Sequence, residues 1–149
     1  MNRIDGKVAV VTGGTQGLGA AIAKLFAEAG ALGIVIVGRD QKKGAKVASE
    51  ISKAYGIQVK MIPADLEKIE DVQRIMVETD NIFGRVDILV NSAGLTDRGN
   101  ILNTNPDLFN RMIAVNTRAP FFLIQDAAKI MIRENIEGRI INIGSMSEH

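Results

Sequence analysis

The chain has 149 residues, enough for one domain with a hydrophobic core and too few for two. With 46% hydrophobic residues, 23% charged residues and a net charge of +1, it resembles an ordinary soluble globular protein and gives no electrostatic reason to expect nucleic acid or an anionic membrane as a partner. The absence of cysteine excludes disulfides, thiolate metal ligands and a cysteine nucleophile, and it fits a reducing compartment.

The sequence predicts neither a secretion signal nor a membrane span. Residues 1–7 contain no apolar core before a cleavage site, and no apolar run approaches the roughly 18–20 residues that a span needs. We therefore expect a cytoplasmic protein. The single histidine, His149, has no second ligand near it in the sequence, so no metal site is expected.

Short apolar segments alternate with helical patterns along the chain, which is typical of a parallel sheet with crossover helices. The predicted strands cover residues 8–11, 34–37, 59–63, 86–90 and 139–143. Right-handed crossovers then give an α/β fold, a Rossmann-type doubly wound parallel sheet with strand order 3-2-1-4-5. The order reverses between the first and fourth strands, so we expect a binding crevice at the carboxyl ends of those two strands.

Helical periodicity predicts which residues face the core. In the first helix the expected inward residues are Leu18, Ala21, Ile22, Leu25, Phe26 and Ala29, and in the second they are Ala45, Ala48 and Ile51. Residues 106–134 are predicted as helical, in two pieces with a break near 116–120, because asparagine and proline disfavour a helix interior.

A glycine-rich turn, Thr12 to Gly19, follows the first strand and opens an amphipathic helix. Gly13 can take a positive φ, Gly17 leaves phosphates unobstructed, and Gly19 allows close packing of the helix on the strand. Backbone amides at such a helix start bind a pyrophosphate. The predicted cofactor contacts in this turn are Thr12, Gly13, Thr15, Gln16, Gly17, Leu18 and Gly19. The alternative is a merely tight strand-to-helix loop; a phosphate-loop NTPase is excluded because no Gly-Lys-Ser/Thr follows.

The spacing T-G-x-x-x-G-x-G of this turn resembles that of the classical short-chain dehydrogenases/reductases. The resemblance implies an oxidoreductase that transfers a hydride between a nicotinamide cofactor and a carbonyl or secondary alcohol. It covers essentially all 149 residues, taken as one dinucleotide-binding Rossmann domain, but only about the first three-fifths of a typical member. The domain is thus expected to be truncated before its last strands, as a fragment or an incompletely recorded chain.

The second strand ends Val37-Gly38-Arg39-Asp40, where NAD-dependent relatives carry an aspartate that we align with Gly38. A guanidinium at Arg39 can bind a 2′-phosphate, and Gly38 removes the carboxylate that would repel it. This favours NADP(H), with NAD(H) as the alternative. Two observations oppose it: Gln16 is neutral where NADP-dependent relatives often carry a basic residue, and Asp40 could take the acidic role. Arg39 could also be a solvated loop cation.

Two further segments match the family at strand ends. The resemblance implies that Asp65 contacts the adenine with Leu66 beside it, although Asp65 taken alone equally suits a helix N-cap. Asn91-Ser92-Ala93-Gly94 matches the N-x-A-G signature, in which Asn91 steadies the sheet and Ala93 and Gly94 leave room for the cofactor. The alternative is a plain strand-ending turn.

The predicted catalytic residues are Ser145 and Asn116. By resemblance, Ser145 (with Ser147 as a lesser candidate) donates a hydrogen bond to the substrate oxygen, and Asn116 opens its helix, binds a water and serves a proton relay. The Tyr-x-x-x-Lys pair that supplies the general acid would lie beyond Ser145 and is absent here. The only tyrosine, Tyr55, ends the second crossover helix, far from the crevice.

The sequence therefore predicts that the intact protein is an NADP(H)-preferring oxidoreductase acting on a small carbonyl or alcohol substrate, and that the present chain alone is inactive. The alternative is a dinucleotide-binding module without catalysis. A methyltransferase-type nucleotide fold is disfavoured by Arg39 and by the motifs at Asn91 and Asn116. By analogy, the intact protein is expected to form a homo-oligomer, a tetramer or dimer, partly through the helix over residues 120–134.

Overall fold

The structure is a computed structural model that describes residues 3–15, 17–94 and 102–144. Its centre is a parallel sheet built from β1 (Val8–Thr12), β2 (Gly33–Gly38), β3 (Gln58–Pro63), β4 (Ile88–Asn91) and β5 (Arg139–Asn142). The strand order is β3-β2-β1-β4-β5, and every neighbouring pair is parallel. The predicted Rossmann-type topology is confirmed.

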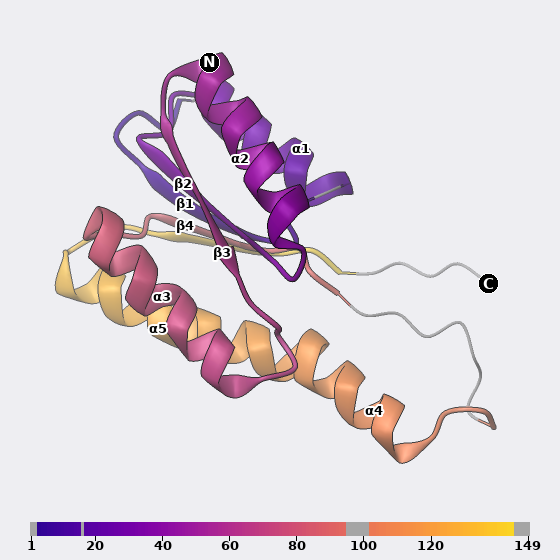
Figure 1. Cartoon of the computed structure of the whole chain (residues 1–149). Helices are drawn as coiled ribbons and strands as arrows, with labels where there is room; N and C mark the ends of the chain where they lie inside the picture. The colour runs from indigo at the N-terminus through magenta and orange to yellow at the C-terminus, as the bar shows by residue number, and fades with distance from the viewer. Residues whose placement is uncertain (1–2, 16, 95–101, 145–149) are drawn as a thin grey trace.

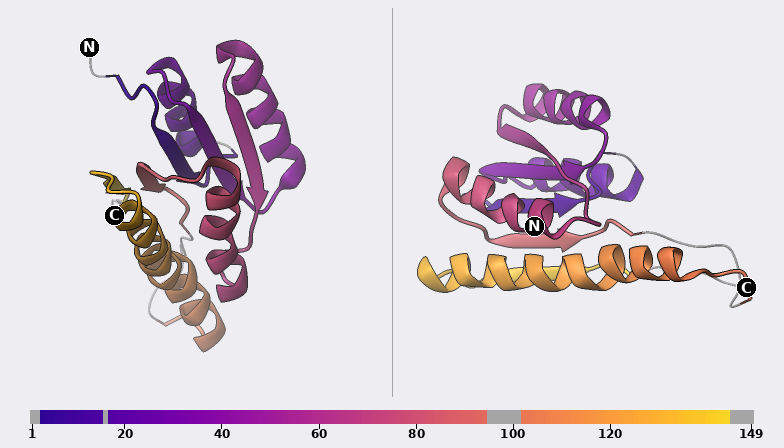
Figure 2. Two further views of the ribbon diagram at one scale, coloured as in Figure 1. Left: turned by 90° about the vertical axis from the view of Figure 1, so that its left-hand side faces the viewer. Right: turned by 60° about the horizontal axis from the view of Figure 1, so that its bottom comes forward.

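Two layers of helices cover the sheet (Figures 1 and 2). One face carries α1 (Gly17–Glu28) and α2 (Gln41–Tyr55). The other carries α3 (Ile69–Phe83) and the long α4 (Pro106–Ile113) to α5 (Ala119–Arg133) helix. Because each crossover returns to the sheet in parallel, all carboxyl strand ends meet at one edge.

The alternation of side chains along the buried strands places apolar clusters on both faces of the sheet. Val35 and Val37 of β2 pack with α3 and α5, whereas Ile34 and Ile36 of the same strand pack with α1 and α2. All four are fully buried, as a strand covered on both faces requires.

The inward faces of α1 and α2 differ from those that periodicity predicts. In α1 the buried residues are Gly19, Ala23 and Ala27, while Leu18 and Leu25 are more than half exposed. In α2, Gly44 is buried and Ala45 is exposed. Small residues bring both helices close to the sheet: a Cβ on Gly44 would lie 2.2 Å from the Met61 sulfur. Periodicity therefore predicted Ala48 and Ile51 correctly, and the partly buried Ile22 and Phe26 pack against the core as expected. It was wrong for the exposed residues Leu18, Ala21, Leu25 and Ala45.

The predicted break near residues 116–120 is a π-helical turn, not an interruption. The turn η1 (Ala114–Arg118) joins α4 directly to α5, and Pro120, the second residue of α5, removes one helical N–H donor directly after this π turn. Asn105 caps α4 by accepting a hydrogen bond from the Leu108 N–H at 2.8 Å. Single-turn π-bulges absorb a residue that disrupts a helix and are frequent at functional sites.

A buried carboxylate, Asp87, anchors the amino end of the sheet. Its side chain is 2% exposed and accepts hydrogen bonds from the Val8 N–H at 2.8 Å and from Arg85 at 2.7 and 2.9 Å. The Lys7 ammonium lies 4.0 Å away. Burial acts to raise the pKa of Asp87, but the Arg85 and Val8 hydrogen bonds and the two positive charges outweigh it and lower that pKa.

Within residues 3–15, 17–94 and 102–144, none of the helices combines the length and apolarity of a membrane span.

Candidate functional site

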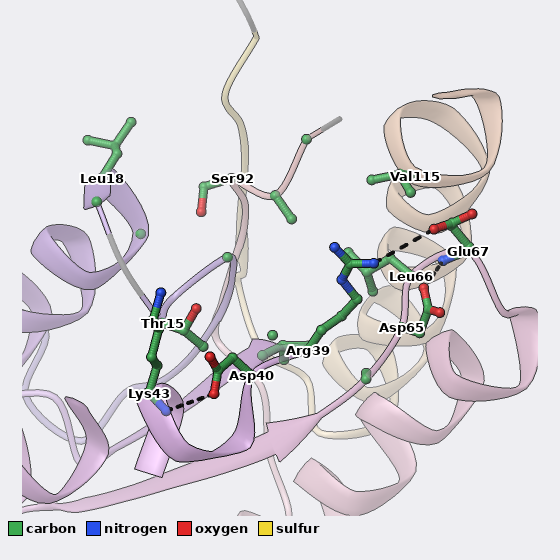
Figure 3. Close-up of a pocket in the computed structure, with 18 of the residues that line it drawn as sticks. Thr15, Leu18, Arg39, Asp40, Lys43, Asp65, Leu66, Glu67, Ser92 and Val115 are labelled. Carbon is green, nitrogen blue, oxygen red and sulfur yellow. Dashed lines mark hydrogen bonds and ion pairs between the residues drawn. The ribbon is translucent and has the colours of Figure 1, made fainter. Parts of the chain in front are cut away.

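A cavity of about 500 Å³ opens at the carboxyl edge of the sheet, where the strand order reverses between β1 and β4 (Figure 3). Its walls are the glycine turn, the end of β2 with the start of α2, the segment after β3, the loop after β4, and η1. Ten of the predicted cofactor residues line it: Gly13, Thr15, Gly17, Leu18, Gly19, Arg39, Asp65, Leu66, Ala93 and Gly94. The crevice therefore lies where the topology predicts it.

Three of the four glycines in the turn, at positions 13, 17 and 19, have different surroundings. Gly13 and Gly17 have φ of +70° and +58°, a region that favours glycine. A Cβ on Gly17 would have no atom within 4 Å, so its absence leaves an open approach to the start of α1. A Cβ on Gly19 would lie 2.1 Å from the Gly13 carbonyl oxygen. Gly17 thus shapes the cavity, and Gly19 permits the turn itself to close.

Thr12 joins the glycine turn to the loop after β4. It is 1% exposed and does not line the cavity. Its Oγ1 accepts hydrogen bonds from the backbone N–H groups of Ser92 at 3.1 Å and Ala93 at 3.2 Å, and the Ser92 hydroxyl donates to the Thr12 carbonyl oxygen. Thr12 therefore positions the Ser92–Ala93 wall rather than contacting the cavity.

Asn91 links β4 to β5. It is 5% exposed, and its Nδ2 donates to Asn142 Oδ1 at 2.8 Å across the paired ends of the two strands. This contact fits the sheet-steadying role that the resemblance implies. Like Thr12, Asn91 does not line the cavity.

A side chain at position 38, at the end of β2, would require Thr15 to move. A Cβ on Gly38 would lie 2.4 Å from the Thr15 methyl carbon. Asp40 is the N-cap of α2, and its Oδ1 accepts a hydrogen bond from the Lys43 N–H at 3.1 Å. Arg39 extends across the cavity, with its guanidinium 4.0 Å from Glu67 (Figure 3). The Asp40 carboxylate, which follows β2 directly and lines the cavity, is thus engaged in capping.

Asp65 does not cap the helix that follows it, so the N-cap alternative is wrong. Helix α3 begins at Ile69 with Lys68 as its cap residue. The Asp65 Oδ1 instead accepts from the Glu67 N–H at 3.0 Å, and the Asp65 N–H donates to Asp71 at 2.8 Å. These bonds fix the segment after β3 as a turn whose side chains border the cavity.

Glu67, which sequence reasoning missed, connects that turn to the helix on the other side of the cavity. Its Oε1 accepts from Arg111 Nε at 2.9 Å, its Oε2 faces Arg39, and its carbonyl oxygen accepts from Arg118 at 2.7 Å. Nothing in the sequence spacing brings residues 39, 67 and 111 together; the tertiary fold does.

Asn116 lies in η1 beside the loop after β4: a Cβ on Gly94 would be 3.6 Å from its Oδ1. The neighbouring Val115 lines the cavity, as do Lys43 and Arg111, none of which was predicted. The predicted residues Gln16 and Ser145, with Ser147 and His149, lie outside the described residues. Gly14 was also missed; a Cβ there would meet Ile36 at 2.8 Å.

Tyr55 is at the end of α2, where its hydroxyl donates to Glu28 at 2.8 Å. The hydrogen bond to this carboxylate raises the pKa of Tyr55, with smaller contributions from burial and charge. Tyr55 does not line the cavity, as expected from its position in the sequence. Within the described segments, no cluster of three or more histidine, aspartate or glutamate side chains could hold a metal ion.

The strand order and a glycine turn at the point of reversal define a Rossmann-type nucleotide-binding fold. The family model described as short chain dehydrogenase matches residues 7–149. The chain therefore belongs to the short-chain dehydrogenase family, whose members are oxidoreductases.

Individual relatives agree with this assignment. Versicolorin reductase 1 from Aspergillus parasiticus is 40% identical over 140 residues, covering 94% of this chain and 52% of the relative. The structure of a metagenomic short-chain oxidoreductase in complex with NADP superposes with a TM-score of 0.88 at 36% identity, covering 96% of this chain and 64% of that one. The structure of L-sorbose reductase from Gluconobacter frateurii, complexed with NADPH and L-sorbose, superposes with a TM-score of 0.90 at 31% identity, and the match covers 95% of this chain and 54% of that one.

The chain spans about half the length of the curated relatives it matches. The residues present nevertheless fit the adenosine and pyrophosphate portions of a dinucleotide. Open space at Gly17, small residues at 93 and 94, and a cavity of about 500 Å³ provide room, and this volume lies within the usual range of about 300–1,000 Å³ for ligand pockets.

Proposed function

We propose that the intact protein is an NADP(H)-preferring oxidoreductase that transfers a hydride between the nicotinamide and a carbonyl or secondary alcohol. The observation that supports the cofactor preference is the end of β2. Thr15 occupies the space that an acidic side chain at position 38 would need, while Arg39 lines the cavity. A guanidinium favours a 2′-phosphate, and a carboxylate would favour a ribose 2′-hydroxyl.

Arg39→Gln tests the preference. We expect NADPH affinity to fall by about tenfold or more, because a charge-assisted contact to phosphate is lost, with little change in NADH affinity. Fluorescence titration of the full-length protein with both nucleotides measures this. Arg3→Gln is the control, since Arg3 pairs with Asp5 before β1 and outside the cavity. Equal or reversed affinities of the unaltered protein for the two nucleotides would contradict the proposal.

The catalytic part of the proposal rests on the family resemblance and on Asn116. Bound NADP(H) supplies the hydride. The Ser145 hydroxyl would donate a hydrogen bond to the substrate oxygen as that oxygen gains negative charge. Asn116, beside Gly94 in the π-helical turn, would hold a water for the proton relay. The proton donor would be a tyrosine of a Tyr-x-x-x-Lys pair after residue 149.

Ser145→Ala in the full-length protein is expected to lower kcat about hundredfold, because one hydrogen-bond donor to the developing oxyanion is lost. The Kd for NADPH should change little. Stopped-flow turnover and nucleotide titration measure the two quantities. Ser147→Ala tests the lesser candidate hydroxyl by the same two measurements. Unchanged kcat in Ser145→Ala would exclude Ser145 as the stabilising group.

The second candidate function is a dinucleotide-binding module without catalysis. The two functions differ in one observable: reduction of carbonyl compounds by NADPH in the full-length protein. We also propose that the intact protein is cytoplasmic and forms a homo-oligomer.

A further inference from the structure

A second cation, Lys43, lines the proposed cofactor cavity. Lys43 lies in the first turn of α2, where its backbone N–H donates to the Asp40 cap. Its side chain extends from α2 toward the turn that carries Thr15 (Figure 3). The cavity-lining set includes Lys43 together with Thr15, Gly38 and Arg39, so both cations border the end of β2.

Arg39 and Lys43 extend in different directions from this edge. The Arg39 guanidinium approaches Glu67 on the segment after β3, whereas Lys43 extends toward the glycine turn on the opposite side of Asp40 (Figure 3). The third cation of the cavity, Arg111, is hydrogen-bonded to Glu67 on the far wall. Lys43 is therefore the cation on the glycine-turn side among the described lining residues.

A 2′-phosphate carries nearly two negative charges, and one guanidinium cannot neutralise it alone. The turn from Thr12 to Gly19 contains no basic residue. The capping bond directs one Asp40 oxygen to the α2 backbone.

Resting on the proposed NADP(H) preference, we propose that Lys43 is a specificity-determining residue that binds the 2′-phosphate opposite Arg39. An ammonium on a flexible stem recognises phosphate as a point charge and does not require the planar geometry of a guanidinium. Lys43 thus supplies from α2 the positive charge that the glycine turn lacks.

The test measures binding without turnover. Isothermal titration of the full-length protein uses 2′-phospho-ADP-ribose and ADP-ribose, which differ only in the phosphate. We expect Lys43→Gln to weaken 2′-phospho-ADP-ribose about tenfold and to leave ADP-ribose affinity unchanged. Lys43→Arg should retain most of the discrimination. Lys42→Gln is the matched control, because it removes the same charge one residue earlier from an exposed position outside the cavity.

The outcomes separate the two proposals. If the unaltered protein binds both probes equally, the proposed NADP(H) preference is wrong, and the role proposed for Lys43 is wrong as well. If it prefers 2′-phospho-ADP-ribose and Lys43→Gln keeps that preference, only the Lys43 assignment is wrong. Equal effects of Lys42→Gln and Lys43→Gln would show general electrostatic attraction and also overturn it. Thermal unfolding of each variant confirms that it is folded.

Discussion

Gly19→Ala is expected to destabilise the protein by about 3 kcal/mol and to abolish nucleotide binding, although it adds a single methyl group. That methyl would lie 2.1 Å from the Gly13 carbonyl oxygen and 2.6 Å from its carbon, both backbone atoms of the same turn. Overpacking in a tightly packed region typically costs about 1–3 kcal/mol, and backbone atoms yield less readily than side chains. Urea unfolding and NADPH titration measure the two effects.

Gly17→Ala is the matched control two residues earlier. Its Cβ would meet nothing within 4 Å, so the expected loss of stability is only the left-handed backbone cost of about 1–2 kcal/mol. Binding should still weaken, because the methyl projects into the space proposed for the phosphates. A stable Gly19→Ala variant would contradict the close packing of the turn, and normal binding by Gly17→Ala would place the phosphates elsewhere.

Asp87→Asn is expected to lower the free energy of unfolding at pH 7 by about 1–3 kcal/mol, because the buried carboxylate loses charge-assisted hydrogen bonds from the partly exposed Arg85. Asp87 also accepts a hydrogen bond from the Val8 N–H, so its replacement should weaken the start of β1, the central strand. Asp5→Asn is the control: Asp5 pairs with Arg3 on the surface and is 68% exposed, and such pairs contribute about 0–1 kcal/mol.

The same carboxylate predicts how stability depends on pH. The pKa of Asp87 is lower in the folded protein than its ordinary value of 3.8, so the folded state favours the ionised form. Its contribution is complete above the unfolded pKa and is lost as pH falls below about 3.8 and through the folded pKa. Urea unfolding between pH 6 and pH 3 should show a smaller acid loss in Asp87→Asn. Parallel curves for the variant and the unaltered protein would contradict this assignment.

Much of the site could be predicted because it depends on local backbone geometry. Gly13 takes the positive φ that was predicted for it, and Gly17, predicted only to leave the phosphates unobstructed, takes one as well. Both lie between a buried strand and a helix. The reason is local: few residues other than glycine tolerate that region, so the sequence reveals such positions directly. The residues that were missed depend on contacts between distant segments. Glu67 is joined to Arg111 of α4, 44 residues away, and no periodicity encodes that distance.

The inward faces of the helices show the same difference between what local sequence predicts and what contacts between distant segments decide. Periodicity correctly predicted that α1 and α2 are amphipathic, yet it placed Leu25 and Ala45 inward. Which residues of each helix face the sheet depends on how closely that helix approaches it. At that distance the glycines and alanines fit against β2 and β3, and a leucine does not.

The sequence by itself determined the parallel sheet, its strand order and the location of the crevice, because alternating buried strands and amphipathic helices allow few right-handed arrangements. It also indicated Arg39 as the residue that we propose to favour NADP(H) over NAD(H). Only the tertiary structure showed that a side chain at position 38 would contact Thr15, that Asp40 caps α2, and that Lys43 borders the same cavity. These relations depend on side chains from separate turns meeting at one sheet edge, which the order of residues alone does not specify.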